Sequence, residues 1–387
     1  FCCGVFFVVS SVLSGGVVKA AAWHLGVGLA LKELGFQFRS HKGPNLSDLE
    51  ISTFVGSSAG ALINMYFTSG FMPEDLIDAH VGKKSSKLAP ISYKDMLSFK
   101  NPMKRPPKSK IYDPLEGFPL FLDKLLSPLV GLSGFFTTEG LKNYLLENVI
   151  QSNSFENYYP DMFVVATQLD HSRKVIFSRY NYPSPYHDST AHYYTGIPIA
   201  ESVAASMSVP PFYSPYPIEN PVTGRTDYYI DGEIRETLST HVAVDNNCEC
   251  IISSWTHTPY HFQDEIGSLI NYGLPAICTQ AIYLMIQKKI VASRAQRKSS
   301  KDIINTVNDY MRGEKFSNHQ RKKIISILER KLNYKKNVHL IDIFPKHKHY
   351  RNFLKNSFSL SPDKLSEHVT SGYKRTLEVF KYHQWEN

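Results

Sequence analysis

The sequence predicts a three-layer α/β fold in which helices cover both faces of a central, mainly parallel sheet. Three observations support this prediction. The first 70 residues alternate between apolar strand-like and periodic helix-like segments, a glycine-flanked serine stands between one such pair, and short apolar runs recur later in the chain. Strands that alternate with helices favour parallel pairing, because each connecting helix packs back onto the sheet.

The expected elements follow from hydrophobic periodicity and glycine turns. In the first 70 residues they are the strand Val5–Leu13, a helix from the Gly15-Gly16 turn to Leu34, the strand Ile51–Val55 and the helix Ala59–Phe67. The later strand candidates are short, apolar and bounded by polar or turn residues: Phe163–Thr167, Val175–Ser178, Tyr228–Ile230, Cys250–Ser253 and His339–Ile343.

The chain has 387 residues and is expected to form a single domain, 1–387, with two insertions. Residues 90–136 are rich in proline and apolar residues and are expected near the mouth of the site. They form either a lid that meets lipid or a subdomain with its own small core. Residues 266–332 are expected to be a basic helical insertion before the last strand.

The charge is distributed unevenly. The formal net charge is +8, and residues 287–387 carry 23 Lys and Arg against 9 Asp and Glu. Such asymmetry favours an anionic partner, a membrane surface or nucleic acid, over the alternative of a solvated helical face. With 42% hydrophobic and 20% charged residues, the composition excludes a disordered chain and a collagen-like or coiled-coil fibre.

The five cysteines predict neither a zinc site nor a disulfide framework, because they form no CxxC pair and have no histidine at ligand spacing. No apolar run reaches the ~20 residues that cross a bilayer, and the longest, Phe1–Leu13, is short. We therefore expect no metal, no cofactor and no membrane span. The expected location is cytoplasmic or peripheral to a membrane, with secretion without a classical signal as the alternative.

The strongest chemical signal is Gly56-Ser57-Ser58-Ala59-Gly60, a G-x-S-x-G motif between an apolar strand and a helix. This context is typical of a nucleophile elbow, which makes Ser58 the candidate nucleophile. Gly56 and Gly60 are expected to be required because a side chain at either position would collide with the adjoining strand or helix.

A glycine turn opens the first helix at Ser14-Gly15-Gly16-Val17. Backbone N–H groups at such a turn can stabilise the oxyanion that forms when a serine attacks an ester carbonyl. We expect Gly15, Gly16 and Val17 to form this oxyanion hole with Ala59. The alternative is a turn that merely binds an anion or packs tightly.

Asp231-Gly232 follows the strand candidate directly, so a carboxylate stands at a strand end with a permissive residue behind it. An aspartate within hydrogen-bond reach of an exposed serine can accept its proton as general base. Asp231 is therefore the candidate base.

Taken together, these motifs resemble the patatin-like phospholipases, lipid acyl hydrolases that use a Ser-Asp dyad. The resemblance covers most of the chain outside the two insertions and includes four further stretches: 19–27 (KAAAWHLGV), 164–170 (VVATQLD), 204–210 (AASMSVP) and Gly372-Tyr373. It implies that Ser58 and Asp231 form the dyad and that the substrate is a phospholipid or another acyl lipid. Peripheral contact with an anionic membrane is expected, and nucleic acid is not expected as a partner.

The chain departs from the family pattern at three positions. Val17 and Ala20 stand where the glycine loop usually has its third and fourth glycines, and Glu233 follows Asp231-Gly232 where Gly or Ala is usual. A β-branched residue is a poor occupant of positive φ, so a loop that requires this conformation is expected to be displaced.

Two other interpretations of the function are compatible with the sequence. One is a catalytically weak or silent protein that binds anionic lipid or nucleic acid. The other is a Ser-His-Asp esterase whose histidine is His241 or His257. Lys19 either brings positive charge to an anionic substrate or is a solvated first-turn lysine.

Overall fold

The computed structural model describes residues 8–43, 47–99, 119, 133–183, 191–221, 223–332, 334–335, 338–346 and 358–383. β1 (Val9–Leu13) corresponds to the described part of the first expected strand. Most of the expected proline-rich insertion, residues 100–118 and 120–132, lies outside the described residues.

Over the described residues, ten strands form one sheet whose main path runs β12, β11, β1, β3, β6, β10, β9. β2 adds to β3, and β7 joins β6 to β8. The strands are β1 (Val9–Leu13), β2 (Gln37–Phe38), β3 (Glu50–Ser57), β6 (Asp161–Gln168), β7 (Arg173–Phe177), β8 (Ala191–Tyr194), β9 (Tyr216–Glu219), β10 (Thr226–Asp231), β11 (Cys250–Ser254) and β12 (His339–Ile343). β4 (Ser98–Phe99) and β5 (Phe136–Thr137) form a separate antiparallel pair.

The sheet is mainly parallel, which confirms the predicted fold class. β12, β11, β1, β3 and β6 run parallel to their neighbours, whereas β6 pairs antiparallel with β7 and β10. The central strands are buried almost throughout, as expected when helices cover both faces. The carboxyl ends of β1 and β3 lie side by side, because Leu13 pairs with Gly56. The glycine turn follows Leu13, and Ser58 follows the end of β3.

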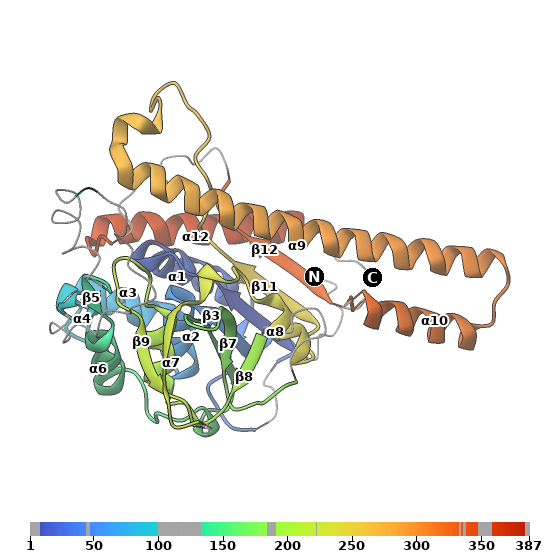
Figure 1. The fold of residues 1–387 in the computed structure, drawn as a ribbon, viewed down its shortest axis with the longest axis horizontal. Coiled ribbons are helices and arrows are strands. Elements are labelled where there is room, and N and C mark those ends of the chain that lie inside the picture. Colours follow the sequence, from blue (N-terminus) through green and yellow to red (C-terminus); the bar gives the residue numbers. More distant parts are fainter. Residues whose placement is uncertain are drawn as a thin grey trace.

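The helices lie over both faces of the sheet and at its edge (Figure 1). They are α1 (Val17–Glu33), α2 (Ala59–Thr68), α3 (Pro73–Val81), α4 (Tyr93–Met96), α6 (Glu139–Asn148), α7 (Ile199–Ser206), α8 (Thr240–Asp245), α9 (Gly273–Gly313), α10 (Asn318–Lys331) and α12 (Pro362–Tyr382). Three 3₁₀ turns complete the described elements: η1 (Phe155–Asn157), η2 (Gly232–Ile234) and η3 (Leu269–Tyr272).

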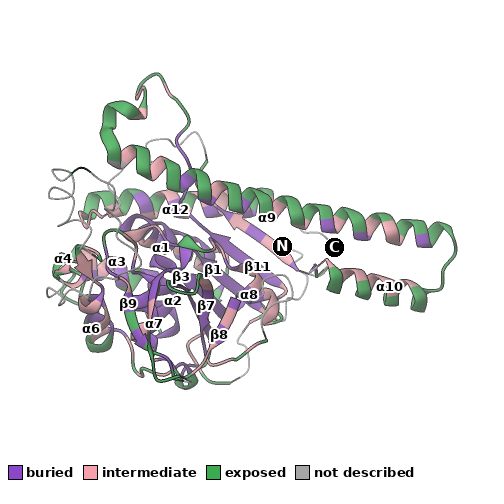
Figure 2. Ribbon diagram, viewed as in Figure 1, coloured by how far each residue is buried: buried purple, intermediate pink, exposed green. Residues whose placement is uncertain are grey.

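Two hydrophobic clusters fill the two faces of the sheet. The larger cluster joins residues of α1, α2, α7 and α12 to strand residues such as Phe54 and Val164. The smaller cluster lies on the other face, where the next residues along, Val55 and Val165, meet α8. This alternation along each strand places the sheet in the middle layer, and Figure 2 shows the strands as the buried centre of the molecule.

α9 and α10 form an arm that projects beyond the sheet (Figure 1). α9 has 41 residues, which corresponds to about 60 Å at the usual rise per residue. Its inner part packs on Trp255 through Ile286 and Ile290, while Figure 2 shows most of its outer part exposed. In the described part of the chain, no helix combines the length and apolar character needed to cross a membrane.

Candidate active site

Ser58 stands at the sharp turn from β3 into α2. Its backbone angles, φ 52° and ψ −124°, are unusual for a residue with a side chain and are typical of the strained turn that presents a nucleophile. The N–H of Ser58 donates to Oγ of Ser206 at 2.8 Å, and this Oγ donates to the carbonyl oxygen of Val165 at 2.6 Å. α7 and β6 therefore hold the backbone of the candidate nucleophile.

The two glycines of the motif stand where there is no room for a side chain. A Cβ on Gly60 would lie 2.1 Å from the carbonyl oxygen of Leu13, and one on Gly56 would lie 2.5 Å from the nitrogen of Ala61. Both contacts are far below the separation that real Cβ atoms adopt. The glycines therefore allow β1, β3 and α2 to meet closely around Ser58.

The glycine loop between β1 and α1 lies beside Ser58. A Cβ on Gly15 would lie 3.2 Å from Oγ of Ser58, so the loop backbone faces the nucleophile. Gly16 has φ 129° and Val17 has φ 57°, so Val17 does occupy the left-handed region that a glycine would adopt freely. The valine adopts this turn at a cost in strain.

The N–H groups of the loop differ in what they contact. Those of Gly16, Val17 and Ala59 donate no hydrogen bond within the described part of the chain. Gly15 departs from the prediction. Its N–H donates to Oε1 of Glu233 at 2.8 Å, so it is not available to substrate in this structure.

Asp231 ends β10 and is 1% exposed. Its Oδ1 accepts the N–H of Glu233 at 2.8 Å, and its own N–H donates to the carbonyl oxygen of Ser208 at 3.0 Å. The buried Oδ2 has no hydrogen bond of full geometry, and the Ser58 hydroxyl lies close enough to lower the pKa of this carboxyl by hydrogen bonding. Such loose contacts are common in catalytic sites without substrate.

Two buried carboxyl groups share this site. Burial, followed by the negative charge of Glu233, raises the pKa of Asp231 to about 8. Burial also raises the pKa of Glu233 to about 7, and hydrogen bonds from Ser57 and Gly15 oppose the shift. Like charges so close disfavour ionisation of both groups, so the pair retains a proton to higher pH than a surface carboxyl does.

The histidines are placed differently from one another. His24 is buried between the carbonyl oxygen of Ser14, 2.9 Å from Nε2, and the hydroxyl of Ser254, 3.1 Å from Nδ1. Because a carbonyl can only accept, Nε2 carries the proton, and burial lowers the pKa of His24 to about 4. This is a packing role rather than that of a base.

The two histidines of the triad alternative lie apart from each other. His241 faces Glu236, with Nδ1 3.4 Å from Oε1. His257 lies against the glycine loop, and its Nδ1 is 4.0 Å from Oε2 of Glu233. Burial lowers the pKa of His257 to about 3, so the ring is neutral.

Lys19 is buried rather than solvated, at 3% exposure. Its Nζ donates to the hydroxyl of Tyr283 on α9 at 2.9 Å, and the ring of Tyr283 packs edge-on against His257. The charge of Lys19 lowers the pKa of His257. The lysine therefore connects the first helix to the arm beside the glycine loop.

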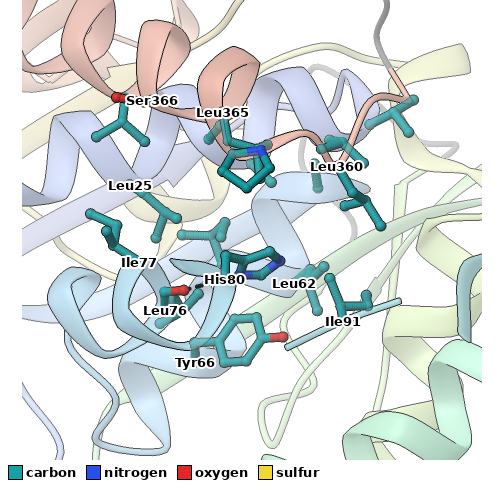
Figure 3. Close-up of a pocket in the computed structure, with 18 of the residues that line it drawn as sticks. Leu25, Leu62, Tyr66, Leu76, Ile77, His80, Ile91, Leu360, Leu365 and Ser366 are labelled. Atoms are coloured by element: carbon teal, nitrogen blue, oxygen red, sulfur yellow. Dashed lines mark hydrogen bonds between the residues drawn. The ribbon is translucent and has the colours of Figure 1, made fainter. Parts of the chain in front are cut away.

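An apolar cavity of about 170 Å³ adjoins the glycine loop and the start of α2. Its wall includes Val17 and Ala59, the neighbours of the candidate oxyanion hole and nucleophile, together with Met207. Figure 3 shows side chains from α1, α2, α3 and α12 that face one another across this space. They include Leu25, Leu62, Tyr66, Leu76, Ile77, His80 and Leu365, with Ile91 and Leu360 from connecting segments.

Several residues of the site could not be assigned a role from the sequence. Ser206 lies in the stretch 204–210 that resembles the family, but only the fold places it under Ser58. Glu233 is visible as a departure after Asp231-Gly232, but its contact with Gly15 spans 218 positions of the chain. Among the residues that the structure describes, no three His, Cys, Asp or Glu side chains are placed to hold a metal ion.

Comparisons with known proteins bear on the family of the chain. A search of curated proteins finds no relative. Among solved structures, the crystal structure of VipD from Legionella pneumophila is similar at a TM-score of 0.40 and 14% identity, over 98% of this chain and 67% of that one. The family model described as patatin-like phospholipase matches residues 12–244, more than half of the chain, including both Ser58 and Asp231. The chain therefore belongs to the patatin-like phospholipase family.

Proposed function

We propose that this protein is a lipid acyl hydrolase of the phospholipase A type, which cleaves carboxylic esters of phospholipids through Ser58 and Asp231. One observation carries the proposal. The candidate nucleophile, a buried carboxyl beside it and open backbone N–H groups meet where an apolar cavity begins at Val17 and Ala59. This arrangement provides the groups needed for acyl transfer and a place for an acyl chain.

In the first half of the reaction, Oγ of Ser58 attacks the ester carbonyl while Asp231 accepts the hydroxyl proton. The N–H groups of Gly16, Val17 and Ala59 stabilise the oxyanion, each typically contributing a few kcal/mol. The intermediate collapses, the bond to the alcohol oxygen breaks, and Asp231 returns its proton to the leaving lysolipid.

In the second half, water attacks the acyl-serine. Asp231 accepts a proton from this water, and the new C–O bond displaces Oγ of Ser58, which takes the proton back. The fatty acid leaves and the enzyme is restored. Because Asp231 must be ionised to act as base, the rate is expected to rise with pH through the pKa of this carboxyl.

The cavity supports an acyl substrate rather than a polar ester. Its wall is almost entirely apolar, and its polar side chains, Tyr66, His80 and Ser366, come from α2, α3 and α12. Each buried methylene of a bound chain contributes about 0.8 kcal/mol. Long acyl chains are therefore expected to bind more tightly than short ones.

The test measures fatty acid and lysolipid released from mixed anionic phospholipid vesicles by mass spectrometry. Ser58→Ala and Asp231→Asn are compared with two control changes at exposed positions, Ser299→Ala and Asp170→Asn. We expect Ser58→Ala to reduce release to background and Asp231→Asn to reduce it at least about a hundredfold, while the controls retain it.

The alternatives predict different results from the same assay. A Ser-His-Asp esterase would lose activity on His241→Asn or His257→Asn as well as on Asp231→Asn, whereas the dyad tolerates both histidine changes. A catalytically silent binder would release no more lipid than Ser58→Ala, yet would bind vesicles or nucleic acid in a salt-dependent manner. Either result would refute the dyad.

We also propose that the arm contacts an anionic lipid surface. α9 and α10 combine exposed lysines and arginines with exposed apolar side chains, among them Leu274 and Met285, which are 72% and 60% exposed. A basic surface gains about 1 kcal/mol for each Lys or Arg near anionic lipid, and apolar side chains add insertion into the interface. Vesicle flotation that weakens as salt rises is the expected result, and equal binding to neutral vesicles would contradict it.

A further inference from the structure

Glu233 is a buried ionisable residue that the Ser-Asp mechanism does not use. It is 8% exposed and lies two residues beyond Asp231, in the turn η2. Its side chain points back into the site rather than out to solvent. A Cβ on Gly15 would lie 2.8 Å from Cγ of Glu233 and 2.7 Å from Cβ of Ser58, so both side chains pack on this glycine.

The carboxyl of Glu233 bridges the two loops of the site. Its Oε1 accepts the N–H of Gly15 at 2.8 Å and the hydroxyl of Ser57, the neighbour of the nucleophile. Its backbone N–H donates to Oδ1 of Asp231 at 2.8 Å. One residue thus contacts the glycine loop, the nucleophile elbow and the base.

The charged and titratable groups around Glu233 come from three directions. Asp231 at the end of β10 is the like charge. His257, which is neutral, lies 4.0 Å from Oε2, with Lys19 of α1 close by, and the hydroxyl of Thr237 lies near enough to lower the pKa of Glu233 by hydrogen bonding. Lys289 of α9 donates to the carbonyl oxygens of Ile234 and Arg235 at 2.8 and 3.2 Å, and its charge favours the ionised Glu233.

We propose that Glu233 is a positioning residue of the hydrolase, whose carboxyl ties the glycine loop to the nucleophile elbow and whose negative charge opposes the ionisation of Asp231. This inference rests on the proposed function of Ser58 and Asp231. The two roles are separable, because one depends on the reach of an acceptor oxygen and the other on charge.

The charge role has a defined direction. An ionised Glu233 raises the pKa of Asp231, so it moves the rise of activity to higher pH. The reach role acts on the geometry of the site. Without an acceptor for Gly15 and Ser57, the glycine loop is free to shift against Ser58, which lowers the maximal rate.

Two substitutions separate these roles. Glu233→Gln keeps an acceptor oxygen at the same reach but removes the charge, whereas Glu233→Asp keeps the charge but shortens the side chain by one methylene. Glu219→Gln is the matched control, because Glu219 is exposed at the far end of the β9–β10 ladder from Asp231.

The measurement is the rate of hydrolysis of mixed anionic phospholipid vesicles from pH 5 to 10. For Glu233→Gln we expect the rise of activity to move about one unit to lower pH. For Glu233→Asp we expect activity to rise at nearly the same pH as in the unsubstituted chain. We expect its maximal rate to be reduced about tenfold or more. His257→Asn checks that the rise of activity with pH does not come from the titration of this histidine. We expect this variant to leave the midpoint of the rise unchanged.

A second readout distinguishes failure of this inference from failure of the proposed function. In chains labelled with ¹³C at aspartate carboxyls, the resonance lost in Asp231→Asn reports the titration of Asp231 without turnover. A shift of this titration to lower pH in Glu233→Gln supports the charge role even if the chain hydrolyses no vesicle lipid. If Glu233→Gln leaves both the pH profile and the titration in place, or if Glu233→Asp and Glu233→Gln have the same effect, the inference is wrong while the dyad stands.

Discussion

Two residues at the candidate site, Val17 and Ser58, hold positive φ angles although both carry side chains. Such conformations cost of order 1–3 kcal/mol each and persist where the surrounding structure enforces them. Around Ser58 the enforcing contacts are visible. Ser206 accepts its N–H, and Gly56 and Gly60 let the neighbouring backbones approach. The strain therefore coincides with the residues that the proposed chemistry uses.

Ser206→Ala is expected to slow hydrolysis without weakening substrate binding. It leaves the N–H of Ser58 and the carbonyl of Val165 without their shared partner, which costs about 1–3 kcal/mol when the groups are buried. We expect kcat to fall roughly tenfold or more, with KM little changed. Ser202→Ala is the control, because Ser202 is buried on the same helix and its hydroxyl donates to the carbonyl oxygen of Pro198. Equal losses in both variants would refute the positioning of Ser58 by Ser206.

Asp231→Asn is expected to stabilise the fold increasingly as pH rises from 5 to 8. The folded-state pKa of Asp231 lies near 8, above an unfolded value of about 3.9, so the folded protein binds more protons than the unfolded chain over this range. The free energy of unfolding then falls with pH by up to about 1.4 kcal/mol per unit, and the asparagine removes this loss. Urea unfolding of both chains at pH 5 and pH 8 measures the difference, and a difference that does not depend on pH would contradict the buried carboxyl.

At the scale of elements, the crossing of α1 and α12 connects the fold to the cavity. Gly26 and Gly372 stand at this crossing, where a Cβ would lie 1.9 Å from the carbonyl oxygen of Val369 and 2.2 Å from that of Trp23, respectively. The same two helices supply Leu25 and Leu365 to the cavity wall. The spacing of the helices therefore sets the width of the cavity.

Gly26→Ala is expected to lower the free energy of unfolding by about 3 kcal/mol and to raise KM for long-chain lipids, because the helices must separate. Gly313→Ala, at the end of α9 where a Cβ meets nothing within 4 Å, is the control and is expected to be nearly neutral. Thermal unfolding and vesicle hydrolysis check both effects. A Gly26→Ala chain as stable as the control would show that the helices adjust without cost.

At the scale of the whole molecule, the basic arm is attached beside the site. Tyr283 and Lys289 of α9 contact Lys19 and the turn after Glu233, so the helix that carries much of the exposed basic surface also supports the active-site loops. If the arm binds a lipid surface as proposed, these contacts connect the bound helix directly to the loops of the candidate site.

Reversing three exposed charges of the arm, Lys298→Glu, Lys322→Glu and Lys323→Glu, is expected to weaken binding to anionic vesicles by roughly a hundredfold at physiological salt. The matched control reverses Lys42, Lys84 and Lys87 on the body of the protein. Hydrolysis of monomeric short-chain lipid is expected to be unaffected in both. Equal losses in the two triple variants would indicate a general charge effect rather than an arm surface.

The local pattern was sufficient to predict the fold class and the main chemical candidates. Apolar runs, glycine turns and the G-x-S-x-G context are read from neighbouring residues, and β1, β3, α1 and α2 formed where they were expected, within a few residues at their ends. Val17 holds a left-handed φ of 57° that the intrinsic preference of valine opposes, so the tertiary surroundings rather than the local pattern set this turn.

Preferences of neighbouring residues specify the alternation of strands and helices, the turn at Ser58 and the carboxylate at the end of β10. The groups that these residues contact depend on the folded chain: Glu233 on Gly15, Ser206 beneath Ser58, and Lys19 buried against Tyr283. The physical reason is the range of the interactions. Turn and periodicity preferences act over a few residues, whereas these contacts join positions 148 to 264 residues apart and exist only once the sheet has brought its strand ends together.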